Sequence, residues 1–414
     1  MKKNILSTCL IITCLFFMLT NIAFANMYTW SVSQETSNSI QQSTSVSAEI
    51  NEGDETGNKL NLQSGSAILI EQTSGQVLYG YNVHEQLRPA SVTKVMSILL
   101  IMEQIELGKL DYTTKVSCSK TAASMGGSQI WLDTSETLSV DEMLKAICVV
   151  SANDCVMAMA EHIAGTEEGF VQLMNAKAQE LGMKDTSFKN CHGLDEDGHV
   201  TSTYDIALMS RELLNKYPEI TKYTTIYMDS LRDGKSSLVN TNKLIRTYNG
   251  CTGLKTGSTS QALFNLSASA TRDDLSLIAV IMKGPTSSIR FDEAKKLLEY
   301  GFNNFEYRKL ALQGEKVKEI VIEKGITKTT EVIFKNDAGA LIPKGQSASI
   351  SQTISLSDSL PAPLAEGETI GKVTYNIGEN KLLEVYLITK DEIKKIDMIT
   401  MACKIYQKWF NLLR

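Results

Sequence analysis

The sequence has no excess of positive charge, because 41 lysine and arginine residues are outnumbered by 47 aspartate and glutamate residues and the formal net charge is −6. Nucleic-acid phosphates attract basic surfaces, so this balance argues against a nucleic-acid partner. A long apolar run is also missing near the N-terminus, where the stretch from Ile5 to Leu19 is short for a membrane-spanning helix.

Cysteine is scarce, with eight residues in 414, and two of them, Cys9 and Cys14, lie in the N-terminal stretch. The other six show no paired spacing typical of a disulfide framework: Cys118, Cys148, Cys155, Cys191, Cys251 and Cys403. We therefore expect free thiols. Cys191, His192 and His199 lie close together in the sequence, but no further ligand pattern supports zinc binding there, so we expect no metal site.

The N-terminus has the features of a secretory signal. Lys2 and Lys3 precede the apolar stretch, and Ala23-Phe24-Ala25 forms a small-residue cleavage site. We expect residues 1–25 to be removed and the protein to be exported. Residues 26–63 are rich in serine, threonine, asparagine, glutamine and glutamate, which predicts a disordered linker.

The pattern from residue 64 onward predicts alternating strands and helices, followed by a β-rich region. Strands are expected at 66–70 and 77–79, and a further adjacent pair at 263–268 and 275–281 with its turn at 271–274. Helices are expected from the Ser91 region to about Gly108, within 136–183, at 205–214 and at 288–300. Short β-type runs punctuated by glycine and proline predict a small all-β domain at 309–389.

The tail at 390–414 has an amphipathic pattern. Its apolar residues step by three and four positions: Ile396, Ile399, Cys403, Tyr406, Phe410 and Leu413. Lysines lie beside this stripe, which is typical of a helix lying in a membrane interface. We expect the tail to hold the protein on the outer face of the cytoplasmic membrane; a terminal helix docked on its own domain is the alternative, and without the anchor the protein would be secreted.

Ser91 and Lys94 stand at the start of an apolar run that continues to Met102. Residues three apart on a helix share a face, so the hydroxyl and the amine would lie one turn apart. Burial lowers the pKa of a lysine, and a neutral amine beside a hydroxyl can accept its proton. A Ser-x-x-Lys pattern alone is weak, because Ser117 and Lys120 match it too, and we attribute that copy to chance.

Two further motifs follow in order, Ser151-Ala152-Asn153 and Lys255-Thr256-Gly257. Ser151 and Asn153 fall at a predicted break between two helices, where their side chains could face a cleft. Serine, asparagine and aspartate also favour helix caps, and on the sequence of this segment alone the cap interpretation is favoured.

The three motifs together are those of penicillin-binding proteins and class A β-lactamases. The chain resembles the low-molecular-mass penicillin-binding proteins, the serine-type D-alanyl-D-alanine carboxypeptidases, from about residue 64 to the C-terminus. His192-Gly193-Leu194-Asp195 resembles a loop of that family. The resemblance implies an α/β penicillin-binding domain at 64–308, an antiparallel sheet flanked by helices, followed by the all-β domain and the tail helix.

The resemblance also implies a mechanism that needs no cofactor. Ser91 would attack the carbonyl between two terminal D-alanines of a peptidoglycan stem peptide, and Lys94 would accept its proton. Ser151 would pass a proton to the leaving amine, and Asn153 would hold the substrate amide and the Lys94 amine. The substrate carboxylate would meet Lys255 and Thr256, with Gly257 allowing close backbone pairing. Backbone N–H groups of Ser91 and Ser258 would form the oxyanion hole, and penicillin would leave a slow acyl-enzyme.

Two other functions remain open. A class A β-lactamase shares the three motifs, but it would need a deacylating Glu-x-x-x-Asn loop before Lys255, which the sequence lacks. A non-catalytic protein that binds the cell wall is the second alternative. The intact Ser91, Lys94, Ser151, Asn153 and Lys255 argue against it.

Overall fold

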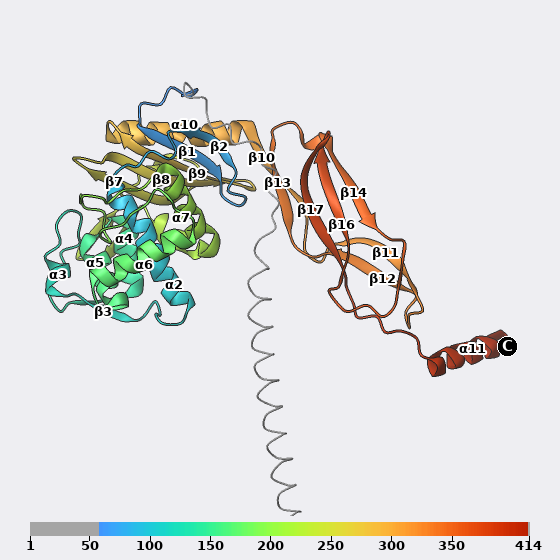
Figure 1. Cartoon of the computed structure of the whole chain (residues 1–414). Helices are drawn as coiled ribbons and strands as arrows, with labels where there is room; N and C mark the ends of the chain where they lie inside the picture. Colours follow the sequence, from blue (N-terminus) through green and yellow to red (C-terminus); the bar gives the residue numbers. More distant parts are fainter. Residues whose placement is uncertain (1–57, 413–414) are drawn as a thin grey trace, which may run out of the picture. The chain divides into compact units, whose positions relative to one another are not determined.

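The computed structural model describes residues 58–412 (Figure 1). The predicted signal and most of the predicted linker lie outside the described residues. The last residues of that linker are ordered, contrary to the expectation for 26–63: Leu62 is buried, its backbone N–H donates to Asn58 Oδ1 at 2.7 Å, and the Gln63 N–H donates to Glu293. Burial of Leu62 in the core explains why order begins before residue 64.

A five-stranded antiparallel sheet with strand order β2-β1-β9-β8-β7 forms the centre of the first domain. Its strands are β1 Ser66–Glu71, β2 Val77–Tyr81, β7 Cys251–Thr259, β8 Leu263–Arg272 and β9 Leu275–Gly284. Alternate residues of a strand face opposite sides, and in β9 Ile278 and Val280 enter one core while Leu277 and Ala279 enter the other. The sheet therefore has an apolar core on each face.

Helices cover both faces of this sheet, as the resemblance implies (Figure 1). Helix α10 (Ser287–Asn304) packs on one face. The other face carries α2 Lys94–Glu106, α4 Val140–Val149, α5 Asn153–Ala164, α6 Glu167–Glu180 and α7 Thr203–Lys216. Shorter elements complete the domain: η1 Ala90–Thr93, β3 Lys115–Ser117, α3 Lys120–Ala123, β4 Thr137–Ser139, η2 Pro218–Ile220, α8 Thr221–Thr224, β5 Met228–Leu231, β6 Ser236–Val239 and α9 Leu244–Thr247.

Three expected boundaries are wrong in detail. The helix predicted from 136 begins at Val140, because Ser139 closes a capping box with Glu142 and residues 137–139 pair with β3. The turn predicted at 271–274 is shorter, since Arg272 pairs with Leu275 and Asp273 adopts φ 51°. Ser91 lies in the 3₁₀ turn η1 rather than in the α-helix itself.

The second domain is all-β, as expected, and begins at β10 rather than at residue 309. A six-stranded sheet with order β14-β16-β17-β12-β11-β15 and the pair β10-β13 make it up. The bounds are β10 Phe305–Ala311, β11 Lys316–Glu323, β12 Thr329–Phe334, β13 Ala338–Pro343, η3 Ser347–Ser349, β14 Ile350–Leu356, β15 Ser359–Pro361, β16 Thr369–Ile377 and β17 Asn380–Thr389.

The tail helix α11 spans Met398–Leu412, so it starts later than the predicted residue 390. Ile393 and Lys395 instead pair with Leu364 and Gly325, and Ile393 is buried in the core of the β domain. The described apolar side chains that are exposed along α11 include Met398, Ile399, Met401, Ile405, Tyr406 and Trp409. Within residues 58–412, no helix combines the length and apolar character needed to cross a bilayer.

Candidate active site

Ser91 and Lys94 are brought together by the junction between η1 and α2. Ser91 lies in the 3₁₀ turn and Lys94 is the first residue of the following helix. Side chains at i and i+3 eclipse each other in a 3₁₀ helix, and the Lys94 Nζ is 2.9 Å from Ser91 Oγ. Ala90 begins the turn at φ 48°, a conformation uncommon for a residue with a Cβ.

The Lys94 amine is completely buried and has two other partners. Its Nζ donates to Asn153 Oδ1 at 2.6 Å and to the backbone carbonyl of His192 at 2.7 Å. Burial, followed by the positive charge of Lys255, holds the Lys94 pKa well below its usual value. A neutral amine has two N–H groups and one lone pair. Because the two carbonyl oxygens accept the N–H groups, the lone pair is left for the Ser91 hydroxyl proton.

Ser151 and Asn153 lie at the break between α4 and α5, where the sequence places them, but they do not cap the helix. The α5 N-cap is Ala152, which makes no side-chain capping bond. The Asn153 side chain instead makes two hydrogen bonds. Its Oδ1 accepts from Lys94, and its Nδ2 donates to the Gly126 carbonyl at 2.6 Å. Ser151 adopts φ 65°, is 3% exposed, and its Oγ has no hydrogen-bond partner within the described chain. A buried hydroxyl without a partner is costly, which points to a functional role.

The third motif lies on β7, an edge strand of the sheet. Lys255 is buried and its Nζ donates to the Thr256 carbonyl at 2.9 Å. Burial lowers the Lys255 pKa to about 7. The Thr256 hydroxyl donates to Thr241 Oγ1 at 2.7 Å, and Ser258 is exposed.

Gly257 fits its position for a reason that the sequence did not reveal. A Cβ at Gly257 would lie 2.8 Å from the Pro89 carbonyl and 2.9 Å from the backbone nitrogens of Ser91 and Val92. The resemblance implies close pairing with substrate, whereas the structure shows close packing of β7 against the backbone of the Ser91 turn. All three predicted motifs therefore meet at one place.

Several residues that support the site are missing from the set predicted from the sequence. A Cβ at Gly193, which has φ 89°, would lie 2.0 Å from the Ala90 carbonyl, so only glycine lets this loop close over the Ser91 turn. Arg290 on α10 donates to the Gly257 carbonyl at 3.1 Å and to the Asn265 carbonyl at 3.2 Å. No local sequence pattern indicates a role for Arg290, because its hydrogen-bond partners lie far from it in the sequence.

The His192 and His199 side chains are engaged within the protein rather than arranged as ligands. His199 Nε2 is 2.8 Å from Thr93 Oγ1, and its Nδ1 accepts the Lys189 N–H. Burial lowers the pKa of His199 to about 4. No group of three or more histidine, cysteine or acidic side chains placed to hold a metal ion occurs within residues 58–412. The second Ser-x-x-Lys copy is a surface feature, since Ser117 and Lys120 are both exposed.

Comparisons with known proteins agree with this arrangement. A family model described as D-alanyl-D-alanine carboxypeptidase matches residues 53–286, and one described as the C-terminal domain of penicillin-binding protein 5 matches residues 305–395. The D-alanyl-D-alanine carboxypeptidase DacF of Bacillus subtilis is 42% identical over 351 residues, 84% of this chain and 90% of that protein.

Solved structures with the same fold include penicillin-binding protein 5 from Haemophilus influenzae. Its TM-score is 0.70 at 32% identity, with coverage of 81% of this chain and 98% of that one. Penicillin-binding protein D2 from Listeria monocytogenes, solved in an ampicillin-bound form, has a TM-score of 0.54 at 29% identity and covers 59% of this chain and 99% of its own.

Proposed function

Because this chain belongs to the D-alanyl-D-alanine carboxypeptidase family, we propose that it removes the terminal D-alanine from peptidoglycan stem pentapeptides through an acyl-enzyme on Ser91. The single observation that carries this proposal is the buried Lys94 amine, which lies 2.9 Å from Ser91 Oγ while two carbonyl oxygens accept its other contacts. This geometry supports nucleophilic catalysis by a serine with a lysine base.

The reaction has two stages. Ser91 Oγ bonds to the carbonyl carbon between the two D-alanines while its proton passes to Lys94 Nζ. The C–N bond then breaks, and the leaving D-alanine amine takes this proton from Lys94 through the Ser151 hydroxyl, which has no partner within the described residues. Water next attacks the ester carbonyl and gives a proton to Lys94. The ester bond to Ser91 Oγ then breaks, and Lys94 returns the proton to Oγ, which restores the hydroxyl.

The edge strand β7 is proposed to hold the substrate. The free carboxylate of the terminal D-alanine would meet the Lys255 ammonium and the Thr256 hydroxyl. Unpaired backbone groups on an edge strand suit the binding of an extended peptide. The backbone N–H groups of Ser91 and Ser258 would stabilise the oxyanion, and the packing of Gly257 against the Ser91 turn supports their convergence.

β-Lactams are proposed to acylate the same serine. The ampicillin-bound form of the Listeria protein supports this for a relative with the same fold. The alternative of a class A β-lactamase is less favoured, because a carboxypeptidase family model matches the first domain and a model of the C-terminal domain of penicillin-binding protein 5 matches the second. A non-catalytic role in wall binding is disfavoured by the assembled Ser91, Lys94 and Asn153 contacts.

We also propose that the protein is exported and that α11 binds the outer face of the cytoplasmic membrane. Its exposed apolar residues, including Ile399, Ile405 and Trp409, support burial in a lipid interface, which is favourable for such a helix.

The test is mass spectrometry of a peptide ending in D-Ala-D-Ala after incubation with the protein. Loss of one alanine, absent in Ser91→Ala and present in Ser117→Ala, is the expected result. Ser117 is the matched control, because it belongs to the exposed second copy of the pattern. An intact peptide with the wild type, or cleavage by Ser91→Ala, would refute the proposal.

A further inference from the structure

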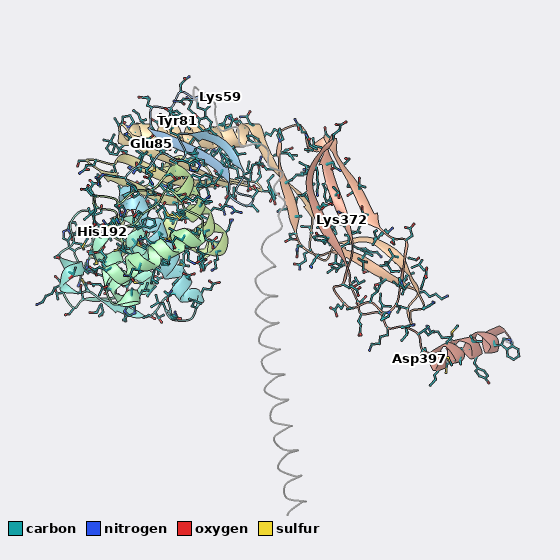
Figure 2. The ribbon with its side chains drawn as sticks, viewed as in Figure 1. Lys59, Tyr81, Glu85, His192, Lys372 and Asp397 are labelled. Atoms are coloured by element: carbon teal, nitrogen blue, oxygen red, sulfur yellow. The ribbon has the colours of Figure 1, made fainter. Side chains whose placement is uncertain are left out.

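The turn at 190–194 contains the His192 carbonyl that accepts the Lys94 amine, and separate hydrogen bonds hold the backbone of this turn in place. Asn190 Oδ1 accepts the Gly193 N–H at 2.7 Å, and the Ser97 hydroxyl donates to the Cys191 carbonyl at 2.6 Å. The His192 carbonyl, between these two anchors, accepts the Lys94 amine. Figure 2 shows His192 within the helical part of the first domain.

Glu167, the first residue of α6, also contacts this turn. Its Oε1 accepts the Cys191 N–H at 3.1 Å and is 3.3 Å from His192 Nε2. Burial and the Glu167 carboxylate raise the pKa of the Cys191 thiol, so this thiol stays protonated. The same carboxylate oxygen, Glu167 Oε1, thus contacts two consecutive residues of the turn, Cys191 and His192.

The bonding of the His192 ring identifies its tautomer. Its Nδ1 accepts the Leu194 N–H at 3.1 Å, so Nδ1 carries no hydrogen. Burial, with Lys94 and His199 nearby, lowers the pKa of His192 to about 3, so the ring is neutral. The remaining hydrogen is therefore on Nε2, which lies 3.3 Å from Glu167 Oε1. Glu167 thus accepts a backbone N–H of the segment that contacts Lys94 and lies beside the His192 ring.

We propose that Glu167 is a positioning residue: through Cys191 and His192 it fixes the carbonyl that orients the Lys94 amine toward Ser91. This inference rests on the proposed role of Lys94 as the base. If the carbonyl shifts, one N–H of the neutral amine loses its acceptor and the lone pair is no longer held on the Ser91 hydroxyl. Small displacements of reacting groups lower catalytic rates strongly. Glu167 has no hydrogen bond or ion pair with Ser91 or Lys94 among the contacts of residues 58–412.

The neighbouring Glu168 provides a matched control. It lies in the same first turn of α6 and is exposed, so Glu168→Ala removes the same charge from the same helix end. We expect Glu167→Ala to slow acylation of the full-length protein by a fluorescent penicillin by about 10-fold or more. Glu167→Gln, which keeps an acceptor oxygen in place, should recover a rate within about 3-fold of wild type. Glu168→Ala should acylate at the wild-type rate.

A second readout reports on the ring directly. With ¹⁵N-labelled histidine, the chain gives signals from only four histidines, and we expect the His192 Nε2–H signature to be lost in Glu167→Ala and kept in Glu168→Ala. If Glu167→Ala does not fold, Glu167→Asp replaces it; the carboxylate is one methylene shorter, and slow acylation is again expected.

Two results would overturn the inference. One is acylation of the folded Glu167→Ala variant at the rate of Glu168→Ala, and the other is a Gln variant as slow as the Ala variant. An unlabelled wild-type protein would instead refute the proposed function, so the two failures are distinguishable.

Discussion

Lys94 and Lys255 are both buried amines, yet the proposed chemistry needs them in opposite protonation states. Lys94 must be neutral to accept the Ser91 proton, and Lys255 must be charged to attract a carboxylate. Burial lowers the pKa of both, and the charge on Lys255 lowers that of Lys94 further. Two like charges close together repel each other. We therefore expect the two lysines to carry one positive charge between them at neutral pH.

The pH dependence of peptide hydrolysis follows from these two groups. As the pH falls through the lowered Lys94 pKa, the base becomes protonated and kcat/KM should fall. As the pH rises through about 7, Lys255 loses its charge, and kcat/KM should fall again, giving a bell-shaped profile. The test is to measure kcat/KM for a D-Ala-D-Ala peptide from about pH 4 to about pH 10, a range chosen to include both pKa values.

Lys255→Arg is the control for the alkaline limb. Arginine stays charged across this range, so the variant should lose the fall near pH 7 while keeping the fall on the acid side. A wild-type profile that stays flat through pH 7, where the Lys255 pKa lies, would show that Lys255 does not titrate in the reaction.

Removal of the base should be far more harmful than removal of a surface lysine. Lys94→Ala should slow penicillin acylation by roughly 10²- to 10⁴-fold, the usual contribution of a general base. Lys120→Ala, from the exposed second copy of the pattern, should acylate normally. Stopped-flow labelling with circular dichroism to verify folding is the measurement, and equal rates for the two variants would exclude Lys94 as the base.

At the scale of elements, the contact between β7 and the η1 turn depends on Gly257. A Cβ at this position would press on three backbone atoms, from Pro89, Ser91 and Val92, which cannot move as a flexible side chain can. We expect Gly257→Ala to destabilise the protein by about 1–3 kcal/mol, as overpacking does, and to slow acylation. Denaturant unfolding and labelling rates test this; wild-type values for both would show that the turn and strand separate easily.

The start of the tail helix at Met398 determines which truncation tests the membrane anchor. Because Ile393 is buried in the β domain and Lys395 pairs with Gly325, deletion of residues 390–414 would remove part of that domain's core. Deletion of 398–414 removes only α11 and the terminal residues. This shorter deletion should leave peptide hydrolysis unchanged and abolish sedimentation with anionic vesicles. Equal partitioning of the truncated and full-length proteins would refute the anchor.

At the scale of the whole molecule, the six described cysteines are all free, as the sparse spacing predicts. Four are buried, Cys251 is partly buried and Cys403 is exposed. Burial raises the pKa of Cys148 to about 12 and that of Cys251 to about 11, which suppresses thiolate formation.

Thiol titration should therefore depend on folding. In protein lacking residues 1–25, one thiol, Cys403, should react rapidly in the native state, and six should react after denaturation without reductant. Fewer than six in the denatured protein would show that a disulfide forms.

The sequence by itself determined the elements and the chemistry carried by short spacings. Ser91 and Lys94 are three residues apart, so almost any helical turn brings them together, and the apolar runs that form β8 and β9 are visible without a structure. Local patterns also predicted free thiols, the all-β second domain and the break between helices at Ser151. Boundaries were less accurate, as at Val140 and Met398, because capping and strand pairing end or delay a helix that its periodicity alone would extend.

Only the tertiary structure decided what surrounds these residues, since contacts between distant segments leave no local periodicity. Asn153 and His192 reach Lys94 from 59 and 98 positions away, and their carbonyl oxygens orient the amine. The sequence allowed Ser151 and Asn153 to be helix caps. In the fold neither makes a capping bond: Asn153 instead contacts Lys94, and Ser151 is buried with an unpartnered hydroxyl within the described residues. Gly257 and Gly193 are required by backbone atoms of a turn far from each in the chain. Burial, which sets the protonation of Lys94 and Lys255, is a property of the folded chain and cannot be assigned to either residue alone.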